Sequence, residues 1–282
     1  MYEAYYRFNA KPFQLSPDPR FFFSSRGHRR AMAYLVYGAH QGEGFIVITG
    51  EIGAGKTLLA RMLARKLESQ MNLVMAQVMS TQLGPDDMLR TVAAGFGLPM
   101  EGTKALLLRN IEQFLLGCRK QGKRALLLVD EAQNLPLNSV EELRMLSNFQ
   151  AGDKSLLQSF LLGQPEFRRT LQSPALEQLR QRVLASCHVG PMDGPETEAY
   201  IRHRLETVGW KGDPSFDEDA HAAIYHYTAG IPRRINVVCD RLLLMGRLDD
   251  KHAFTGKEVA AVIDDMEQEF SPAAVHANGG LV

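Results

Sequence analysis

The sequence predicts an α/β fold, a parallel sheet with helices on both faces, followed by a small all-α domain. Over residues 27–190, short and nearly uninterrupted apolar runs alternate with segments of helical periodicity. This alternation is typical of buried parallel strands and the helices that cover them. After Gly190 the apolar runs stop and helix-start signals take their place. With 282 residues, 45% of them hydrophobic, the chain can form one large or two modest domains.

The chain divides into four predicted segments. Residues 1–26 are rich in aromatics and proline, and we expect them to be extended and packed on a neighbouring surface. Within 27–190 we expect strands at 45–49, 73–79, 125–129, 156–162 and 183–189, and helices at 27–40, from 55, at 85–96, 104–121 and 139–149, with short helices up to 182. Within 191–270, the patterns Asp193-x-x-Glu196, Ser215-x-x-Glu218 and Thr255-x-x-Glu258, together with Pro232, predict four helices. Residues 271–282 are expected to fray.

Composition excludes several classes of protein. The 32 basic and 32 acidic residues give a formal net charge of zero, so no global field favours nucleic acid or an anionic membrane. Cys118, Cys187 and Cys239 lie far apart, which argues against a disulfide framework or structural zinc and predicts buried thiols. No apolar run approaches the roughly 18 residues of a membrane span, and the first residues lack signal-peptide features. We therefore expect a cytoplasmic protein.

A phosphate-binding loop follows the first expected strand. Residues 50–57 read G-E-I-G-A-G-K-T, a complete G-x-x-x-x-G-K-[ST] motif, directly after the apolar run 45–49. Backbone N–H groups of such a loop and the N-terminus of the next helix bind phosphates, Lys56 reaches the β/γ oxygens, and Thr57 offers its hydroxyl to Mg²⁺. The predicted nucleotide-binding residues are Gly50, Glu51, Ile52, Gly53, Ala54, Gly55, Lys56, Thr57 and Leu58. The alternative is a glycine-rich turn without a ligand.

Two carboxylates end the third expected strand. Four apolar residues, 126–129, precede Asp130 and Glu131, as in a Walker B strand. A buried parallel strand brings its last residues to the same sheet edge as the phosphate loop. We therefore predict that Asp130 supports Mg²⁺ with Thr57, and that Glu131 polarises the attacking water. The alternative is an acidic turn at the surface.

Further polar residues complete the predicted catalytic set. Gln164 follows the apolar run 160–162 and Gly163, where its amide can bridge the γ-phosphate and the water. Arg233, after Gly230-Ile231-Pro232, stands in the first turn of a helix of the second domain, from which it can approach the phosphates. Arg180 and Arg182 precede the last strand, where an arginine can project into a neighbouring subunit's site. Exposed arginines more often only solvate a face.

Over residues 1–270, the chain resembles AAA+ ATPases of the ExeA-like, general-secretion-pathway A-type family. It is most similar to the ATPase associated with exosortase and exopolysaccharide gene clusters. The resemblance rests on P-F-Q-L-S-P-D-P-R-F-F-F (12–23), H-Q-G-E-G-F-I-V-I-T-G-E-I-G-A-G-K-T (40–57), L-V-D-E-A-Q-N-L (128–135), E-E-L-R-M-L-S-N-F (141–149), L-L-G-Q-P-E-F (161–167) and G-I-P-R-R-I-N (230–236).

The resemblance implies roles for three of the predicted residues. It makes Gln164 sensor 1, Arg182 an arginine finger and Arg233 sensor 2, and it implies a homo-oligomer, often a hexamer. Secretion-type relatives carry a membrane segment and a peptidoglycan-binding domain beyond the ATPase. Because the sequence stops at Val282, we do not expect direct cell-wall binding.

The leading hypothesis is an ATPase that uses ATP and Mg²⁺ to remodel or regulate a protein partner in envelope secretion or exopolysaccharide export. It would work in the cytoplasm, either free or peripheral at the inner membrane. The alternative is a DNA-dependent loader or transposition regulator, which the local clusters Arg26-His28-Arg29-Arg30 and Arg119-Lys120-Lys123-Arg124 favour and the zero net charge disfavours. A third hypothesis, a nucleotide-dependent switch with little turnover, is disfavoured by Glu131. The phosphate loop does not distinguish adenine from guanine.

Overall fold

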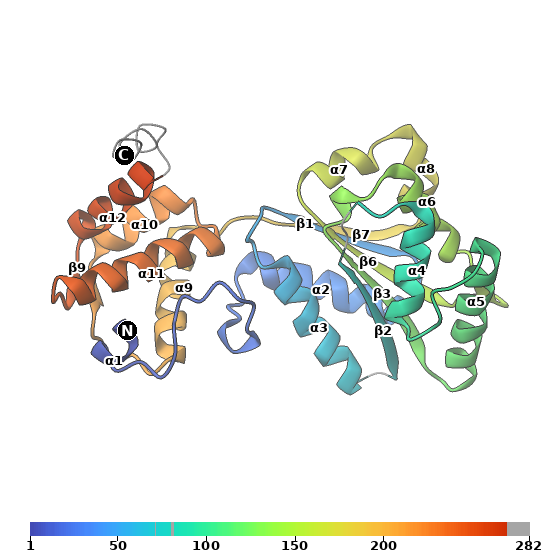
Figure 1. Ribbon diagram of the computed structural model, residues 1–282, viewed down its shortest axis with the longest axis horizontal. Coiled ribbons are helices and arrows are strands. Elements are labelled where there is room, and N and C mark those ends of the chain that lie inside the picture. The colour runs from blue at the N-terminus through green and yellow to red at the C-terminus, as the bar shows by residue number, and fades with distance from the viewer. Residues whose placement is uncertain (71, 80–81, 270–282) are drawn as a thin grey trace, which may run out of the picture. The chain divides into compact units, whose positions relative to one another are not determined.

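The computed structural model describes residues 1–70, 72–79 and 82–269 (Figure 1). The chain forms two compact units. One comprises Arg26–Gly190, and the other combines Met1–Ser25 with the chain from Pro191 onward. The predicted frayed segment 271–282 lies outside the described residues.

The first unit is built on a five-stranded parallel sheet with strand order β2-β3-β6-β1-β7. The strands are β1 (Phe45–Gly50), β2 (Leu73–Met79), β3 (Arg124–Asp130), β6 (Leu157–Gly163) and β7 (Val183–Val189). Strands β1 and β6 are buried along their whole length, which explains why β1 is a nearly continuous apolar run rather than an alternating one. Strand β6 also buries two polar residues, Gln158 and Ser159. The predicted α/β class and its five strands are confirmed.

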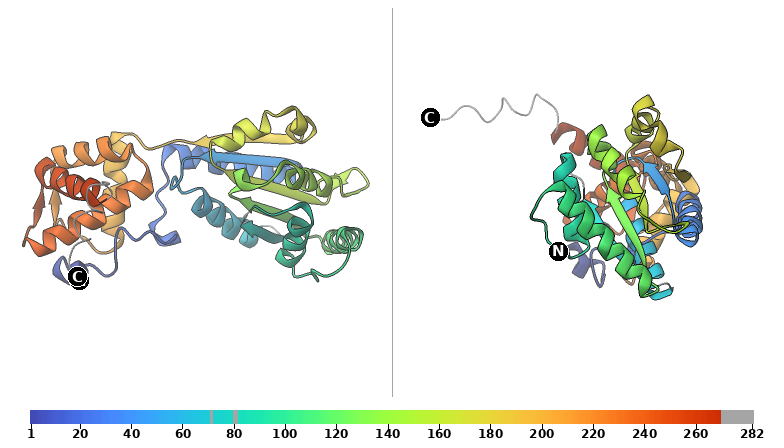
Figure 2. Two further views of the ribbon diagram at one scale, coloured as in Figure 1. Left: turned by 45° about the horizontal axis from the view of Figure 1, so that its top comes forward. Right: turned by 90° about the vertical axis from the view of Figure 1, so that its right-hand side faces the viewer.

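Helices cover both faces of this sheet (Figure 2). They are α2 (Arg26–Gln41), α3 (Lys56–Gln70), α4 (Pro85–Gly95), α5 (Lys104–Lys120), α6 (Leu137–Leu146), α7 (Glu166–Leu171) and α8 (Glu177–Arg180), with 3₁₀ turns η2 (Ala132–Asn134) and η3 (Pro174–Leu176). Phe45 and Val47 share a core with α4 and α5. The alternate residue Ile46 faces α2, because a Cβ built on Gly38 would come within 2.4 Å of its side chain.

One part of this unit differs from the prediction. The expected helix at 139–149 is instead α6, which begins directly after Pro136 and ends at Leu146. The chain then forms an antiparallel hairpin of β4 (Gln150–Ala151) and β5 (Lys154–Ser155). Its turn contains Gly152 at φ +67°, a conformation that suits glycine. Two-residue strands have no periodicity that a sequence pattern can reveal.

Within residues 191–269, the described part of the second unit after Gly190, the chain forms four α-helices, as predicted. They are α9 (Gly194–Thr207), α10 (Glu218–Thr228), α11 (Pro232–Leu248) and α12 (Gly256–Glu269). The expectation that strands stop after Gly190 is wrong in one detail, because β8 (Ser215–Phe216) and β9 (Ala253–Phe254) form a short parallel pair. This pair fixes the entries to α10 and α12.

The aromatic N-terminal segment forms part of the core of this helical unit. Its buried aromatic side chains are Tyr2, Tyr6, Phe8, Phe13 and Phe21, and they pack with residues of α9, α10, α11 and α12. Arg204 of α9 lies 4.5 Å from the centre of the Phe21 ring and donates a hydrogen bond to the Gln14 carbonyl. The expectation of packing is confirmed. The expectation of an extended segment is wrong in part, since α1 (Tyr2–Tyr5) and η1 (Pro19–Phe21) are helical.

The helix-start signals are largely confirmed. Asp193 accepts a hydrogen bond from the Glu196 N–H at 2.9 Å, and the Glu258 carboxylate accepts one from the Thr255 N–H at 2.9 Å. For α10 the predicted cap Ser215 is wrong, because its N–H donates to the His252 carbonyl in the strand pair. Asp217 caps this helix instead.

The three cysteines are free and buried, as expected. Across the residues that the structure describes, no helix is both long enough and apolar enough to span a bilayer.

Candidate active site

The phosphate loop connects β1 to α3 at the carboxyl edge of the sheet. Gly50 ends the strand and Lys56 begins the helix. Gly53 and Gly55 have φ of +81° and +85°, a region that side chains with a Cβ rarely adopt, so the loop requires glycine at both positions. The remaining predicted members differ in exposure: Glu51 and Ile52 are exposed, Ala54 is buried, and Leu58 is half-buried.

Lys56 is buried at the base of the loop. Its ammonium donates hydrogen bonds to the Gly50 carbonyl at 2.8 Å and the Glu51 carbonyl at 3.0 Å. Burial lowers the pKa of Lys56, and the negative charges of Glu131 and Asp130 oppose this effect. Both carboxylates therefore act on the same ammonium. A buried cation whose partners are neutral carbonyls is suited to receive an anion.

Thr57 and Asp130 form an oxygen pair beside Lys56. The Thr57 hydroxyl donates a hydrogen bond to Asp130 Oδ2 at 2.6 Å. Asp130, the last residue of β3, is 1% exposed, and its other oxygen accepts a hydrogen bond from the Glu131 N–H at 3.0 Å. A hydroxyl and a carboxylate in contact are hard oxygen donors of the kind that Mg²⁺ prefers. The residues therefore fit the cation that a nucleoside triphosphate carries.

The Glu131 carboxylate is held by two glutamines. Its Oε2 atom accepts hydrogen bonds from Gln133 Nε2 at 2.6 Å and from Gln164 Nε2 at 3.2 Å. The Gln133 side-chain oxygen in turn accepts the Gln164 backbone N–H at 2.9 Å. Glu131 itself has φ +52° and ψ +41°, a left-handed conformation that is uncommon for a residue with a side chain. The carboxylate is thus fixed in place by one residue of η2 and by the residue that directly follows β6.

Gln133 and His28 were not predicted as site residues. Gln133 belongs to the short 3₁₀ turn after β3 and follows Glu131 by two positions, a spacing that no general motif marks. His28 of α2 is buried, and its Nε2 donates a hydrogen bond to the Ala54 carbonyl at 2.9 Å. It also fills the space that a Cβ on Gly55 would need, 3.0 Å away. In the sequence His28 stood only in a basic cluster, so nothing linked it to the loop.

Arg182 lies at the opposite edge of the sheet from the phosphate loop of its own chain. Its carbonyl accepts the Phe45 N–H at 3.0 Å, at the amino end of β1, whereas Gly50 pairs with Val189 at the other end. A strand of this length separates the two ends by roughly 20 Å. The Arg182 guanidinium donates to the Ser147 hydroxyl at 2.9 Å. The structure therefore does not bring Arg182 to the site of its own chain.

The other two arginines are exposed. Arg180 forms an ion pair with Glu177 at 2.6 Å, one turn earlier in α8. Arg233 is the second residue of α11, directly after Pro232. It belongs to the helical unit, where it lines a pocket of about 480 Å³ with Tyr227 and Met266. Its approach to bound phosphates stays a prediction.

Comparisons with known proteins show what this chain is similar to. A family model described as an AAA domain matches residues 39–171, which include the phosphate loop, Asp130, Glu131, Gln133 and Gln164. The general secretion pathway protein A of Aeromonas hydrophila is 36% identical over 263 residues. That similarity covers 92% of this chain but only 47% of the relative, so the chain spans about half the length of that protein.

Solved structures share the fold at low sequence identity. The Aeropyrum pernix ORC2 protein, solved as ADPNP–ADP complexes, has a TM-score of 0.67 at 16% identity, covering 93% of this chain and 75% of its own. The Thermotoga maritima RuvB Holliday junction branch migration motor has a TM-score of 0.56 at 16% identity, covering 86% and 70%. The matched AAA domain and the 36% identity along 92% of this chain support an ExeA-like AAA+ protein related to general secretion pathway protein A, and the solved structures show that the fold is shared.

Proposed function

We propose that this chain hydrolyses ATP with the help of Mg²⁺ and uses the reaction to drive assembly and to remodel or regulate a partner protein. One observation carries the proposal. The Glu131 carboxylate, held between Gln133 and Gln164, lies at the same sheet edge as the Thr57–Asp130 oxygen pair and acts electrostatically on Lys56. This is the arrangement that phosphoryl transfer to water requires, namely a cation for the phosphates, oxygen donors for a metal and a carboxylate beside the attacking water.

The residues of the loop bind the triphosphate. Backbone N–H groups of residues 50–57 and the N-terminus of α3 supply donors and a favourable dipole. Lys56 exchanges its two carbonyl partners for phosphate oxygens. Thr57 and Asp130 would hold Mg²⁺, which when bound offsets the negative charge of the phosphates.

Glu131 and Gln164 act on the water. The carboxylate accepts a hydrogen bond from the water and so raises its nucleophilicity, while the amide of Gln164 contacts the water and the γ-phosphate. Two fixed hydrogen bonds already define the direction of the Glu131 carboxylate. Little reorganisation is then needed when the reaction begins.

The metal dependence tests this proposal directly. Purified protein supplied with ATP and Mg²⁺ should release inorganic phosphate, and chelation with EDTA should reduce the rate to background because the Thr57–Asp130 pair loses its cation. Restoring Mg²⁺ in excess should restore the rate. Phosphate release that is indifferent to EDTA, or no release under any condition, would contradict the proposal.

Gln133 is proposed as the residue that positions Glu131. Replacing Gln133 with alanine removes the 2.6 Å hydrogen bond and the bond to the Gln164 N–H. We expect kcat to fall about tenfold while KM for ATP stays unchanged, because the lost bonds orient the water rather than the nucleotide. Asn134→Ala, in the same turn and exposed, is the matched control and should keep the kcat of the unmodified protein. An unchanged kcat in Gln133→Ala would contradict this role.

The active unit is proposed to be a homo-oligomer, with a hexamer as the resemblance implies. Arg182 lies roughly a strand length from the loop of its own chain, so it could serve as an arginine finger only for a neighbouring copy. Arg233 is proposed as sensor 2 in the same chain. Together they would supply positive charge to the transition state from outside the sheet.

Mixing two inactive variants tests the finger. Arg182→Ala should bind ATP normally but lose about a thousandfold in turnover, as removal of an arginine finger does. Mixed with Glu131→Gln protein, it should regain part of the activity, because some interfaces then pair an intact Glu131 with an intact Arg182. Arg180→Ala tests the other candidate finger and should remain active if Arg182 is the finger. If mixing rescues nothing, Arg182 is not a finger that acts between chains.

The biological role is proposed from the similarity to general secretion pathway protein A. We propose that the protein is a cytoplasmic ATPase, either free or peripheral at the inner membrane. It would act on a component of envelope secretion or exopolysaccharide export. Because the chain spans 47% of that relative, nothing is carried over from the rest of the relative. ATP-dependent capture of a membrane glycan-export component would support this role, and capture of DNA or a transposase would support the loader alternative instead.

A further inference from the structure

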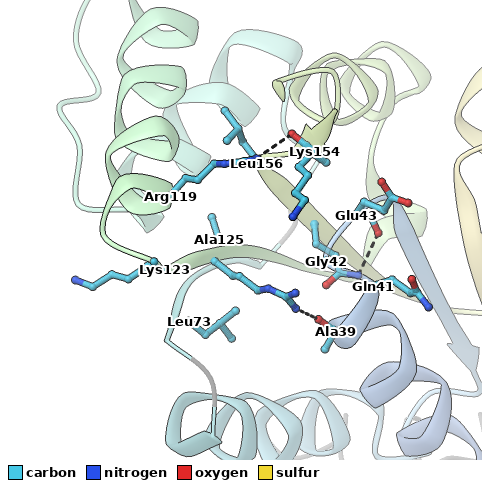
Figure 3. Close-up of a pocket in the computed structure, with 14 residues that line it drawn as sticks. Ala39, Gln41, Gly42, Glu43, Leu73, Arg119, Lys123, Ala125, Lys154 and Leu156 are labelled. Carbon is cyan, nitrogen blue, oxygen red and sulfur yellow. Dashed lines mark hydrogen bonds between the residues drawn. The ribbon is translucent and has the colours of Figure 1, made fainter. Parts of the chain in front are cut away.

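A pocket of about 400 Å³ lies at the amino end of the sheet, the edge opposite the phosphate loop (Figure 3). The first residues of β2 and β3, Leu73 and Arg124, line it, together with Gln158 near the start of β6. The last turns of α2 and α5 and the β4–β5 hairpin complete the wall. The pocket lies entirely within the α/β unit.

The lining is strongly cationic. It contains four cationic residues, Arg119, Lys123, Arg124 and Lys154, against one carboxylate, Glu43, which leaves a formal excess of three positive charges. The whole chain has a formal net charge of zero, so this excess is local. Within the described ranges, none of the four cations forms an ion pair with a carboxylate. The pocket therefore has positive charge that the protein itself does not neutralise.

The four cations are not equivalent. Arg124 donates to the Ala39 carbonyl at 2.7 Å and so caps the C-terminus of α2, which gives it a structural role. Arg119 donates to the Lys154 carbonyl at 3.4 Å and links α5 to the hairpin. Figure 3 shows the Lys154 side chain extending from the hairpin into the hollow above Gly42, whereas Lys123 points away from it. Lys154 and Arg119 are the cations that can meet a ligand without loss of a helix cap.

We propose that this pocket binds a small phosphorylated molecule. Guanidinium and ammonium groups together form the usual recognition set for a phosphate, the first by paired hydrogen bonds and the second as a point charge. The volume lies in the range of small-molecule sites. Apolar atoms of Leu73, Leu156 and Ala125 also line the pocket, so the site offers a surface for an uncharged body attached to the phosphate.

The position also separates this site from the nucleotide. Strand β1 starts beside the pocket and ends at Gly50, and β3 runs from Arg124 to Asp130. Both sites thus lie on the same strands, at opposite ends, about 20 Å apart. A phosphate bound here cannot be the phosphate that Lys56 holds, and a second binding event should be measurable.

Calorimetry with inorganic pyrophosphate tests the pocket. The full-length Lys56→Ala protein in EDTA serves as the background, because its phosphate loop lacks the buried cation and metal binding is prevented. We expect one pyrophosphate per chain, with affinity at least tenfold weaker after Arg119→Gln and Lys154→Gln are combined. Lys120→Gln is the matched control, because Lys120 is the last residue of α5, next to Arg119, but does not line the pocket. Added to the Lys56→Ala protein, it should leave the affinity for pyrophosphate unchanged.

The outcomes are decisive in either direction. Absence of binding, or equal loss in the Lys120→Gln control, would overturn the site. Thermal melting shows whether the double variant is still folded. If it is not, Lys154→Gln alone replaces it in the test, because Lys154 lies on an exposed hairpin. A 20-nucleotide DNA that displaces pyrophosphate and binds more tightly through Arg119 and Lys154 would assign the phosphates to a polymer and overturn the small-molecule ligand.

Discussion

Glu131→Gln is expected to bind ATP as tightly as the unmodified protein and to hydrolyse it at least about a hundredfold more slowly. The substitution keeps the size and hydrogen-bonding reach of the side chain but removes its capacity to accept a proton. General base catalysis contributes roughly 10² to 10⁴ in rate, so its loss should be confined to the chemical step. Phosphate release in a single turnover measures the rate, and calorimetry measures the affinity.

A second carboxylate near the site provides the control for this variant. Glu166, the first residue of α7, is exposed and also opposes the lowering of the Lys56 pKa by burial. If Glu131 acts only through its charge on Lys56, Glu166→Gln should also slow hydrolysis. We expect Glu166→Gln to turn over normally. Normal turnover in Glu131→Gln would mean that another residue orients the water.

The stalled variant also gives access to the partner. Glu131→Gln should remain in the ATP-bound form, so any assembly that ATP favours should accumulate. Size-exclusion chromatography with and without ATP would report the oligomer. The same material is the best bait for the protein on which the ATPase acts.

The sheet could be predicted from sequence because its strands are unusual in composition. Residues 45–49 and 126–129 are almost wholly apolar, since parallel strands are covered on both faces, and each run ends in a chemically distinctive group. The phosphate loop and the Asp130–Glu131 pair could then be placed at one edge by the rule that parallel strands end together. The contact between Thr57 and Asp130 at 2.6 Å agrees with that placement.

The features that escaped prediction share a physical cause. The pairs β4–β5 and β8–β9 are two residues long, too short for a periodic pattern, and arise from tertiary contacts. Gln133 reaches the site because it lies in a 3₁₀ turn that follows the left-handed backbone of Glu131. The residue types alone determine neither of these two features. His28 reaches the loop only because α2 packs against it. Such neighbours become visible only when the chain is folded.

Lys56→Ala is expected to eliminate measurable ATP binding. Charge-assisted hydrogen bonds contribute about 1.5–3 kcal/mol each, and Lys56 offers a buried ammonium whose two present partners are neutral carbonyls. Losing two such bonds to phosphate weakens binding by at least about a hundredfold. Lys66→Ala, ten residues further along α3 and about 15 Å away by the helical rise, is the control and should bind normally.

Thermal melting separates this loss of binding from misfolding. Burial lowers the pKa of Lys56, which means that the buried ammonium reduces the stability of the nucleotide-free protein. Lys56→Ala should therefore melt at the same temperature as the unmodified chain, or higher, when no nucleotide is present. Added ATP and Mg²⁺ should raise the melting temperature of the unmodified chain and of Lys66→Ala but not of Lys56→Ala, because only a bound ligand stabilises the folded state by mass action. An ATP-dependent rise in Lys56→Ala equal to that of the unmodified chain would show that the phosphates bind elsewhere, and it would remove the basis on which Thr57, Asp130 and Glu131 are assigned to the reaction.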